Sequence, residues 1–210
     1  MELDLLVNYP SADRRGVVRT EEDRKVARRF GREFFDGVRE QGYGGYHYHP
    51  KYWSQVVPLF REYYELSEGS SVLDVGCAKG FMLYEFQNLG LDVSGLDISD
   101  YAISKAIEPV KSFVRVGDAK SLPYGDKSFD LVVSINTLHN LARNDLIASL
   151  REISRVGWYS FITVDAYRDE AEKKRMEAWN LTAKTVLHVA EWEELFNEAG
   201  YEGDYYWTFV

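Results

Sequence analysis

The chain has 210 residues, of which 45% are hydrophobic and 28% charged, and its formal net charge is -9. This composition excludes a disordered or fibrous chain, and the negative charge disfavours a nucleic-acid partner, because phosphates attract basic surfaces. The sequence has no apolar run of the ~18 residues that a membrane span needs, no start typical of a signal peptide and a single cysteine, so we expect a cytoplasmic protein with no membrane partner and no disulfide.

Residues 1–68 differ in composition from the rest of the chain. Between Arg14 and Arg39, nine basic and five acidic residues give a net charge of +4 on an otherwise acidic protein. Thr20 before three acidic residues predicts a helix start, since a hydroxyl caps the first N–H groups and acids face the positive end of the helix dipole. Helical spacing predicts a buried stripe of Val26, Phe30, Phe34 and Val38.

The arginines of this helix have two interpretations. As a solvated face, they pair with acids one helical turn away. As a binding site, Arg28 and its neighbours hold a phosphate or carboxylate of a substrate, because a guanidinium binds such groups through two parallel hydrogen bonds. The second interpretation applies if Arg14, Arg15 and the helix face one pocket.

The segment from Gly42 to Trp53 alternates tyrosines with glycines and histidines, which predicts a loop. Its rings suit a mobile lid that stacks on a substrate and excludes water, and Tyr46 and Tyr48 are the candidate substrate contacts. In the alternative, the rings bury the extension against the core. We assign residues 1–68 to a helical extension with this aromatic loop, and residues 69–210 to a second domain.

From residue 70 onward, short apolar runs alternate with helical patterns. The runs cover 71–76, 92–97, 112–117, 129–135 and 158–165, and the helical patterns cover 80–89, 99–108 and 140–156. Strands that alternate with helices predict βαβ units, and runs rich in Val, Ile and Leu predict parallel strands covered on both faces. We expect an α/β fold with a three-layer, doubly wound, mostly parallel sheet, which binds ligands at the carboxyl ends of its strands.

Glycine and acidic residues follow the predicted strands where they end. Gly76 and Gly80 bracket the turn after the first strand, which lets a ligand approach the backbone and the N–H groups of the next helix. Asp97 ends the second strand, where a carboxylate can accept hydrogen bonds from both hydroxyls of a ribose. Asp118 follows the third strand, where its carboxylate can accept a hydrogen bond from an adenine amino group. Together these positions predict a site for a nucleoside cofactor.

The segments VLDVGCAKG, GLDIS, VGDAKSLPYGDKSFDLVVSINTLHNL and EWEELFNEAGY resemble those of the class I, Rossmann-like S-adenosylmethionine-dependent methyltransferases, over residues 50–210. The resemblance implies an enzyme that uses S-adenosylmethionine and releases S-adenosylhomocysteine. The cofactor-binding residues it implies are Asp74 for the amino group, Gly76, Ala78 and Gly80 around the methionine part, Asp97 with Ile98 at the ribose, Asp118 with Ala119 at the adenine, and Asn136 beside the sulfonium. Ala78 departs from the family pattern, which usually has glycine there.

Two alternatives stay open. An NAD-dependent oxidoreductase would need a third glycine where Phe81 stands, and Phe81 does not suit that close packing of helix on strand. A non-catalytic sensor or scaffold with the same fold would bind the cofactor without turnover. Methylation of RNA is disfavoured by the net charge of -9.

The sequence defines the methyl acceptor less closely. The stretch from NYP to GYGGY resembles the leading segment of methyltransferases of sugar and surface-polysaccharide metabolism, which implies a small-molecule acceptor of sugar, nucleotide-linked or phosphorylated type. His139 is the candidate general base, although a histidine here can also pack or cap the next helix. Asp165 and Tyr167 end the fifth strand and are candidates for binding acceptor hydroxyls. The histidines have no spacing that predicts a metal site.

The C-terminal region leaves the end of the sheet open. Residues 168–184 predict a helix after the fifth strand, a common place for a substrate cover. Members of the family usually close the sheet with an antiparallel hairpin, whereas only one late strand, 205–210, is visible here. Either residues 185–189 supply another strand or the sheet is one strand short. A short sheet exposes an apolar edge that a second subunit can cover, so we include a homodimer among the expected partners.

Overall fold

The computed structural model describes residues 1–10 and 19–210, and it contains a single seven-stranded sheet with helices on both faces. The strands follow the order β3-β2-β1-β4-β5-β6, and β7 pairs with β5. Every pairing between these strands is parallel. The predicted α/β fold with a doubly wound, mostly parallel sheet is therefore confirmed. The predictions about Arg14 and Arg15 lie outside the described residues.

The strands are β1 (Ser71–Val75), β2 (Asp92–Asp97), β3 (Val114–Val116), β4 (Phe129–Ile135), β5 (Gly157–Tyr167), β6 (Leu187–His188) and β7 (Asp204–Thr208). The helices are α1 (Glu21–Ala27), α2 (Arg32–Asp36), α3 (Val57–Tyr63), α4 (Phe81–Asn88), α5 (Asp100–Ser104), α6 (Arg143–Val156), α7 (Glu170–Trp179) and α8 (Val189–Ala199). No helix in the described part of the chain is long and apolar enough to cross a lipid bilayer.

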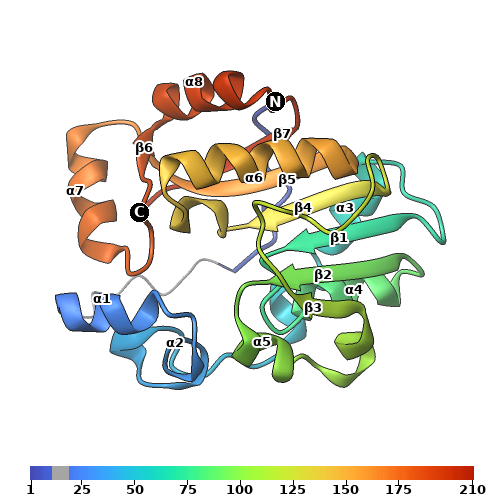
Figure 1. Ribbon diagram of the computed structural model, residues 1–210, viewed down its shortest axis with the longest axis horizontal. Coiled ribbons are helices and arrows are strands. Elements are labelled where there is room, and N and C mark those ends of the chain that lie inside the picture. The colour runs from blue at the N-terminus through green and yellow to red at the C-terminus, as the bar shows by residue number, and fades with distance from the viewer. Residues whose placement is uncertain (11–18) are drawn as a thin grey trace.

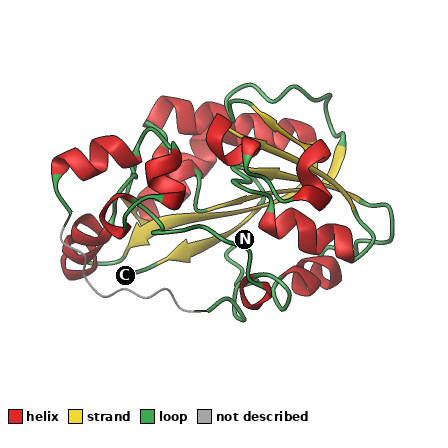
Figure 2. Ribbon diagram, turned by 90° about the horizontal axis from the view of Figure 1, so that it is seen from below, coloured by secondary structure: helices red, strands yellow, loops and turns green. Residues whose placement is uncertain are grey.

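The sheet separates two hydrophobic clusters, because successive side chains of a strand point to opposite faces. Val72 packs with α3 and α4, whereas its neighbour Leu73 packs with α6 and α8. Phe161 and Ile162 of β5 divide in the same way. The strands run through the middle of the molecule, with helices on both sides (Figures 1 and 2). The helices α6 and α8 lie together over one face (Figure 1). This alternation explains why the strands carry continuous apolar runs.

The extension shares this core. Phe60 of α3 is fully buried, and its ring meets that of Phe161 edge-on with 4.9 Å between the centroids. The division at residue 68 stays a prediction, since α3 packs directly on the sheet.

The N-terminal helix starts as predicted but is shorter. The Thr20 side chain accepts the N–H of Asp23, whose carboxylate in turn accepts the N–H of Thr20. The helix ends at Ala27, and Phe30, with φ of 50°, turns the chain before α2 begins. The predicted buried stripe is therefore wrong: Val26, Phe30 and Phe34 are only partly buried and Val38 is 57% exposed, because the turn at Phe30 and the end of α2 break the helical register. The buried residues of the two helices are Ala27 and Phe35.

The end of the sheet differs from an antiparallel hairpin. Residues 187 and 188 form the short β6, and β7 runs parallel to β5, with Phe161 to Asp165 paired to Asp204 to Thr208. The aromatic last strand packs inward, since Trp207 is 3% exposed. Glu2 forms a parallel bridge to Tyr205, so the N-terminal residues lie along β7. This contact occupies part of the edge that we expected a second subunit to cover, and the homodimer stays a prediction.

Candidate functional site

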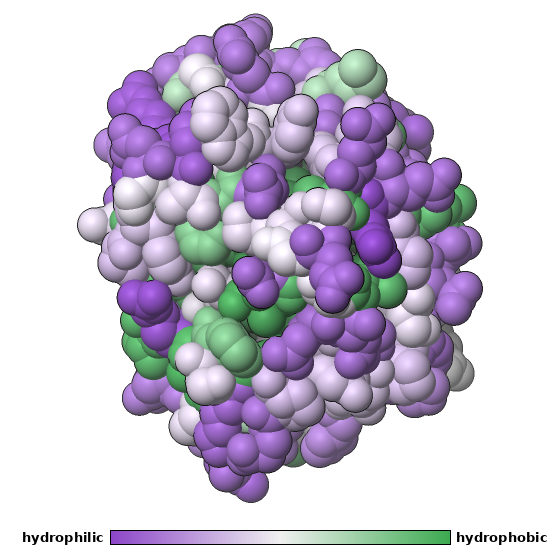
Figure 3. Space-filling view, turned by 90° about the vertical axis from the view of Figure 1, so that its right-hand side faces the viewer, coloured by the Kyte–Doolittle hydropathy of each residue, from purple (hydrophilic) through white to green (hydrophobic). Residues whose placement is uncertain are grey.

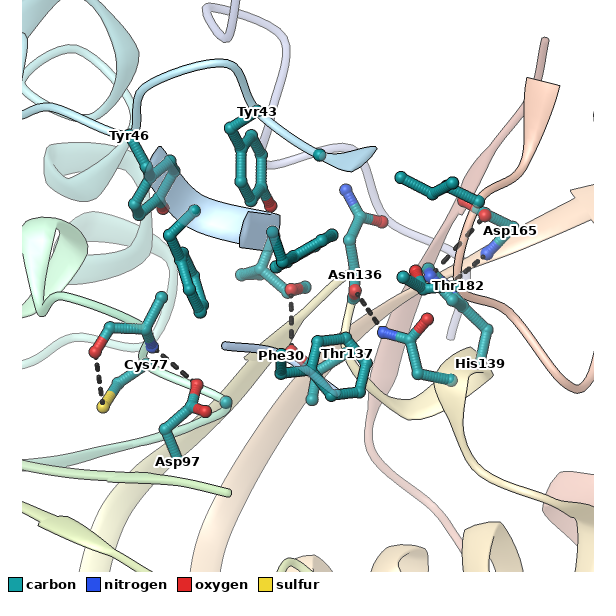
Figure 4. A pocket seen from close by; sticks show the side chains of 18 of the residues that line it. Phe30, Tyr43, Tyr46, Cys77, Asp97, Asn136, Thr137, His139, Asp165 and Thr182 are labelled. Atoms are coloured by element: carbon teal, nitrogen blue, oxygen red, sulfur yellow. Dashed lines mark hydrogen bonds and ion pairs between the residues drawn. The ribbon is translucent and has the colours of Figure 1, made fainter. Parts of the chain in front are cut away.

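A cavity of about 1110 Å³ lies at the carboxyl ends of the strands, where the order of the sheet reverses between β1 and β4. One wall consists of the strand tips, and the other consists of the N-terminal extension, the loop 179–184 and the last residues of the chain. In Figure 4, Asp97 and Cys77 lie on one side, His139 and Asp165 on the other, and Asn136 between them. The opposite face of the molecule, where the strands begin, is largely hydrophilic with smaller apolar areas near its middle (Figure 3).

The turn after β1 requires glycine for two reasons. Gly76 has φ of +87°, and a Cβ there would lie 2.2 Å from Oγ1 of Thr137. Gly80, at the N-terminus of α4, has φ of +78°, and a Cβ there would lie 2.6 Å from a methyl of Val110. Ala78 adopts φ of 49°, the left-handed conformation that favours glycine. The departure from the family pattern is therefore tolerated here with backbone strain.

Two buried carboxylates lie side by side at the tips of β1 and β2. Asp97 accepts the backbone N–H groups of Ala78 and Ser99, each at 2.8 Å. The Asp74 side chain accepts no hydrogen bond from any residue that the structure describes. Burial, with the nearby charge of Asp97, raises the pKa of Asp74 to about 8. Burial also raises the pKa of Asp97, against the effect of its backbone hydrogen bonds. Neither carboxylate has a basic partner among the described residues, so this wall suits a cationic or hydrogen-bond-donating ligand.

The residues that follow β2 and β3 line another part of the cavity. Ile98 exposes 59% of its surface there, which is unusual for an apolar side chain beside a cavity and suits contact with a planar ring. Asp118 and Ala119 line the same region. Lys120 donates its backbone N–H to Asp118 at 3.0 Å, and its Nζ lies 3.5 Å from the same carboxylate.

Asn136 follows β4 and faces the centre of the cavity (Figure 4). Its φ is 50°, and its backbone N–H donates to the hydroxyl of Thr163 at 2.8 Å. Its side-chain oxygen accepts from Thr163 at 2.9 Å and from Thr208 at 3.0 Å. The strands β4, β5 and β7 thus fix this amide in place.

His139 is buried and hydrogen-bonded within the protein. Its Nδ1 accepts the backbone N–H of Asp165 at 3.1 Å, which leaves the proton on Nε2, 3.5 Å from the Asp165 carboxylate. Asn180 donates to the same carboxylate at 2.6 Å. Burial lowers the pKa of His139, although Asp165 opposes this. The imidazole is thus neutral, and the only ring nitrogen that can accept a hydrogen bond, Nδ1, is occupied by the backbone N–H of Asp165. The general-base role stays a prediction, and this arrangement offers no such lone pair to a ligand.

The extension is attached to the glycine turn through Asp36. Lys79, itself buried, places Nζ 2.8 Å from each Asp36 oxygen and 2.7 Å from the carbonyl of Tyr46. Tyr101 donates to Asp36 at 2.7 Å. Burial alone would raise the pKa of Asp36, but the hydrogen bonds from Lys79 and Tyr101 outweigh it and lower the pKa to about 2. This one carboxylate therefore joins both walls of the cavity.

Aromatic rings continue this contact. The Tyr46 ring stacks on that of Phe81, with 4.8 Å between centroids, and lies 4.4 Å from that of Tyr43. Both tyrosines line the cavity (Figure 4). The rings thus pack on the core and face the cavity at once, so both interpretations of the loop keep support.

The structure brings most of the predicted site residues to one cavity. The residues from the prediction that line it are Arg28, Tyr46, Asp74, Gly76, Ala78, Asp97, Ile98, Asp118, Ala119, Asn136, His139 and Asp165. Three others lie outside its lining. Gly80 is one residue beyond the turn, Tyr48 donates to Glu85 of α4, and the Tyr167 hydroxyl donates to Glu191 of α8 at 3.4 Å.

Sequence reasoning missed the Asp36–Lys79 pair and the loop 179–184. A lysine inside a buried glycine turn was a signal that an acid must lie nearby. Its partner, however, is 43 residues earlier in the chain. Thr182 and its neighbours reach the cavity only because of where α7 packs, which no local pattern indicates.

Comparisons with known proteins agree with this geometry. A family model described as "Methyltransferase domain" matches residues 73–157, from β1 to the start of β5. The chain is 32% identical over 158 residues to the sterol 24-C-methyltransferase erg6 of Aspergillus fumigatus, a match that covers 65% of this chain and 41% of that protein. The chain thus spans about two fifths of that relative's length.

Solved structures share the fold at lower identity. The YcgJ protein of Bacillus subtilis superimposes with a TM-score of 0.55 at 20% identity, over 68% of this chain and 66% of that one. Phosphoethanolamine N-methyltransferase 2 of Haemonchus contortus, solved with phosphomonomethylethanolamine and S-adenosylhomocysteine, gives 0.56 at 21% identity, over 74% of this chain and 39% of that one. The chain thus contains a methyltransferase domain over residues 73–157, and the order of its sheet and these likenesses show the class I methyltransferase fold.

Proposed function

We propose that this chain transfers a methyl group from S-adenosylmethionine to a small-molecule acceptor held in the cavity. The observation that carries the proposal is the pair of buried carboxylates, Asp74 and Asp97, which lack a basic partner among the described residues. They lie beside a glycine turn whose backbone is in the left-handed conformation. Ionising both carboxylates in this buried site is costly, and a ligand that supplies positive charge or hydrogen-bond donors offsets that cost.

The cofactor that the family uses fits these residues. Its amino group is a cation that Asp74 can hold, and its ribose hydroxyls are donors for the oxygen lone pairs that Asp97 does not use on the backbone. Ile98 offers an apolar surface for the adenine, with Asp118 beside it to accept from the adenine amino group. Gly76, Cys77 and Ala78 line the cavity, so the backbone of the turn is open to the methionine part.

When bound, the cofactor would supply an electrophilic methyl group on its sulfonium sulfur for an oxygen, nitrogen or carbon of the acceptor, which would lose its proton to solvent. The chain itself then contributes alignment and exclusion of water, and alignment alone supplies about 7–11 kcal/mol in favourable cases. Asn136, fixed by Thr163 and Thr208, and the rings of Tyr43 and Tyr46 are the groups placed to hold the acceptor.

A small acceptor agrees with the size of the cavity. Pockets for drug-sized ligands measure about 300–1,000 Å³. A volume of about 1110 Å³ accommodates a nucleoside cofactor together with a small second ligand. The extension covers this space from the side opposite the strand tips, which supports a metabolite over a macromolecule as the acceptor.

The proposal is tested by calorimetric titration of S-adenosylhomocysteine, S-adenosylmethionine and NAD into the wild type and into Asp97→Asn. We expect both adenosyl compounds to bind and NAD not to bind. Asp97→Asn should weaken the binding of both by about 10-fold or more, because it loses charge-assisted hydrogen bonds. Asp92→Asn is the matched control: Asp92 is exposed at the other end of the same strand, and the change should leave affinity within twofold.

Binding of NAD without the adenosyl compounds would contradict the proposal, as would equal affinity in Asp97→Asn and Asp92→Asn. Far-ultraviolet circular dichroism on both variants separates a lost fold from a lost ligand. Incubation with methyl-labelled donor and fractionated cell extract then distinguishes an enzyme from a sensor, because only an enzyme forms a labelled small molecule.

A further inference from the structure

The wall of the cavity that faces the strand tips carries positive charge. Arg19, Arg28, Arg29 and Arg39, all from the extension, line it. None of the four forms an ion pair with an acid in residues 1–10 or 19–210. The strand tips carry the opposite charge, so the cavity has an acidic side and a basic side.

Two of these arginines are held in place by backbone carbonyls after α7. Arg19 donates to the carbonyl of Trp179, and Arg28 donates to that of Ala183 at 3.5 Å. A guanidinium has five N–H donors, so these bonds use only a small part of its capacity. The Nε atoms of both arginines are buried and have no hydrogen-bond partner. Buried donors without partners are rare in folded proteins, and each calls for an acceptor.

Among the described residues, the charged groups with the largest effect on Arg19 are Arg39 and Arg24, both positive. Burial lowers the pKa of Arg19, and Arg39 and then Arg24 lower it further. Arginine nevertheless stays protonated in proteins, so the repulsion is not relieved by loss of a proton. An anion placed between Arg19 and Arg39 would relieve it.

Arg24 shows what an arginine that serves only as an attachment looks like here. It lies on α1 one turn before Arg28 and donates to the carbonyls of Asn180 and Glu177, so it also joins the extension to α7. Unlike Arg28, it pairs with an acid, Glu21, at 3.3 Å, and it does not line the cavity. Attachment to α7 therefore does not require an unpaired guanidinium that faces the cavity.

We propose that Arg19 and Arg28, with Arg39 beside them, form an oxyanion site that binds a phosphate or carboxylate of the methyl acceptor. This inference rests on the proposed function for the identity of the second ligand. Paired guanidinium groups match the geometry of both oxyanions. The acceptor's anion is then held by the extension, while the cationic cofactor is held by the strand tips, so its reactive atom faces the methyl group between them.

The first experiment measures anion binding directly. Inorganic phosphate is titrated into the full chain at constant ionic strength, with chloride as the balancing anion, and binding is followed by calorimetry. The variants are Arg28→Gln, Arg19→Gln and Arg28→Lys, and the matched control is Arg24→Gln. S-adenosylhomocysteine is titrated into each variant in parallel.

We expect phosphate to bind the wild type and Arg24→Gln with affinities within twofold of each other. Arg28→Gln and Arg19→Gln should each weaken phosphate binding by about 10-fold or more. The affinity of Arg28→Lys should lie between that of the wild type and that of Arg28→Gln, since lysine keeps the charge but lacks the planar guanidinium that forms two parallel hydrogen bonds. S-adenosylhomocysteine affinity should stay within twofold in all of them. Phosphate binding that is absent in the wild type, or equally weakened by Arg24→Gln, would overturn the inference.

The two proposals fail in different ways. A wild type that binds phosphate but not S-adenosylhomocysteine contradicts the proposed function and leaves the oxyanion site in place. The reverse result contradicts the oxyanion site alone. Labelled product from cell extract supplies a further test: it should be retained on an anion-exchange column. If phosphatase removes that retention, the group is a phosphomonoester, and if retention persists, the group is a phosphodiester or a carboxylate. An unretained product overturns the inference.

Discussion

The strand tips and the N-terminal extension present opposite charges to the same cavity. At the strand tips, Asp74 and Asp97 are buried by the sheet and held by the turn that follows β1. In the extension, Arg19 and Arg28 are held by the carbonyls of a loop more than 150 residues later in the chain. The first wall depends on local sequence and the pairing of neighbouring strands, and the second depends on contacts between distant segments.

This difference separates two properties of the molecule. The sheet positions its acids through a backbone that is fixed wherever this fold forms, so the strand tips suit a ligand shared by a whole family. The extension can change its side chains without disturbing the sheet, so it suits the ligand that differs from one enzyme to the next. Asp36 and Lys79 connect the two walls, so we expect the largest loss of stability when this pair is broken.

Removing the connection should have the largest effect. Asp36→Asn leaves the buried ammonium of Lys79 without its counter-charge, and breaking a buried pair in this way costs about 3–5 kcal/mol. Glu33→Gln, on the same helix but exposed and unpaired in the described structure, is the control and should cost under about 0.5 kcal/mol. Urea unfolding of both variants measures the difference. Equal stability would mean that the two walls are held independently.

The glycine turn sharpens the comparison from the side of the sheet. Gly76→Ala places a methyl group against Thr137 and puts an alanine in the left-handed conformation. Together these two effects should lower the free energy of unfolding by about 2–5 kcal/mol. Gly69→Ala is matched in backbone, with φ of +81°, but has no atom within 4 Å of its Cβ, so only the backbone part of about 1–2 kcal/mol remains. Only Gly76→Ala should also weaken S-adenosylhomocysteine in calorimetry. An equal effect on binding would show that the clash at Thr137 is irrelevant.

The acid side should also respond to pH. In the ligand-free protein the pKa of Asp74 is about 8, above its ordinary value of 3.8, so the folded state holds a proton that the unfolded state releases between these values. Stability therefore falls as the pH rises from 4 to 8. Asp74→Asn removes this dependence and should stabilise the ligand-free protein by about 1–3 kcal/mol at pH 8, with less effect at pH 5. Unfolding midpoints at both pH values test the sign, and a destabilised variant at pH 8 contradicts it.

The smallest expected effect lies in the same turn. Ala78→Gly relieves the strain of a left-handed alanine, about 1–2 kcal/mol, but increases the entropy of the unfolded chain by about 0.4–1 kcal/mol, so the net gain in stability is about 0–1.6 kcal/mol. Thermal unfolding should show a slightly higher midpoint, with S-adenosylhomocysteine affinity within twofold of the wild type. A lower midpoint would indicate that the Ala78 methyl makes contacts that outweigh its strain.

Local patterns sufficed for the sheet and its tips. The run from Phe129 to Ile135 matches β4 to the residue, because an apolar stretch covered on both faces has few alternatives. Asp97 and Gly76 could be placed because parallel strands end at one edge, so positions far apart in sequence are forced together.

The extension could not be worked out in this way. Helical spacing alone predicted a buried position for Val38. Phe30, however, adopts a left-handed backbone conformation, and the predicted helix is divided there into the two short helices α1 and α2. Tyr48 and Tyr167 looked like binding residues by composition and strand position, yet each has a carboxylate partner on a neighbouring helix. Such partners are set by tertiary packing, which a single sequence does not encode in any local pattern.

The carboxylate of Asp36 has a thermodynamic consequence. Because it receives Lys79 from the glycine turn, Tyr101 from α5 and the N–H of Tyr46 from the aromatic loop, the two ligand compartments share one rigid link. If the proposed cofactor tightens that link and so raises the affinity for the proposed acceptor, the acceptor must raise the affinity for the cofactor by the same factor. The two ligands of the proposed function are then heterotropic effectors of one another.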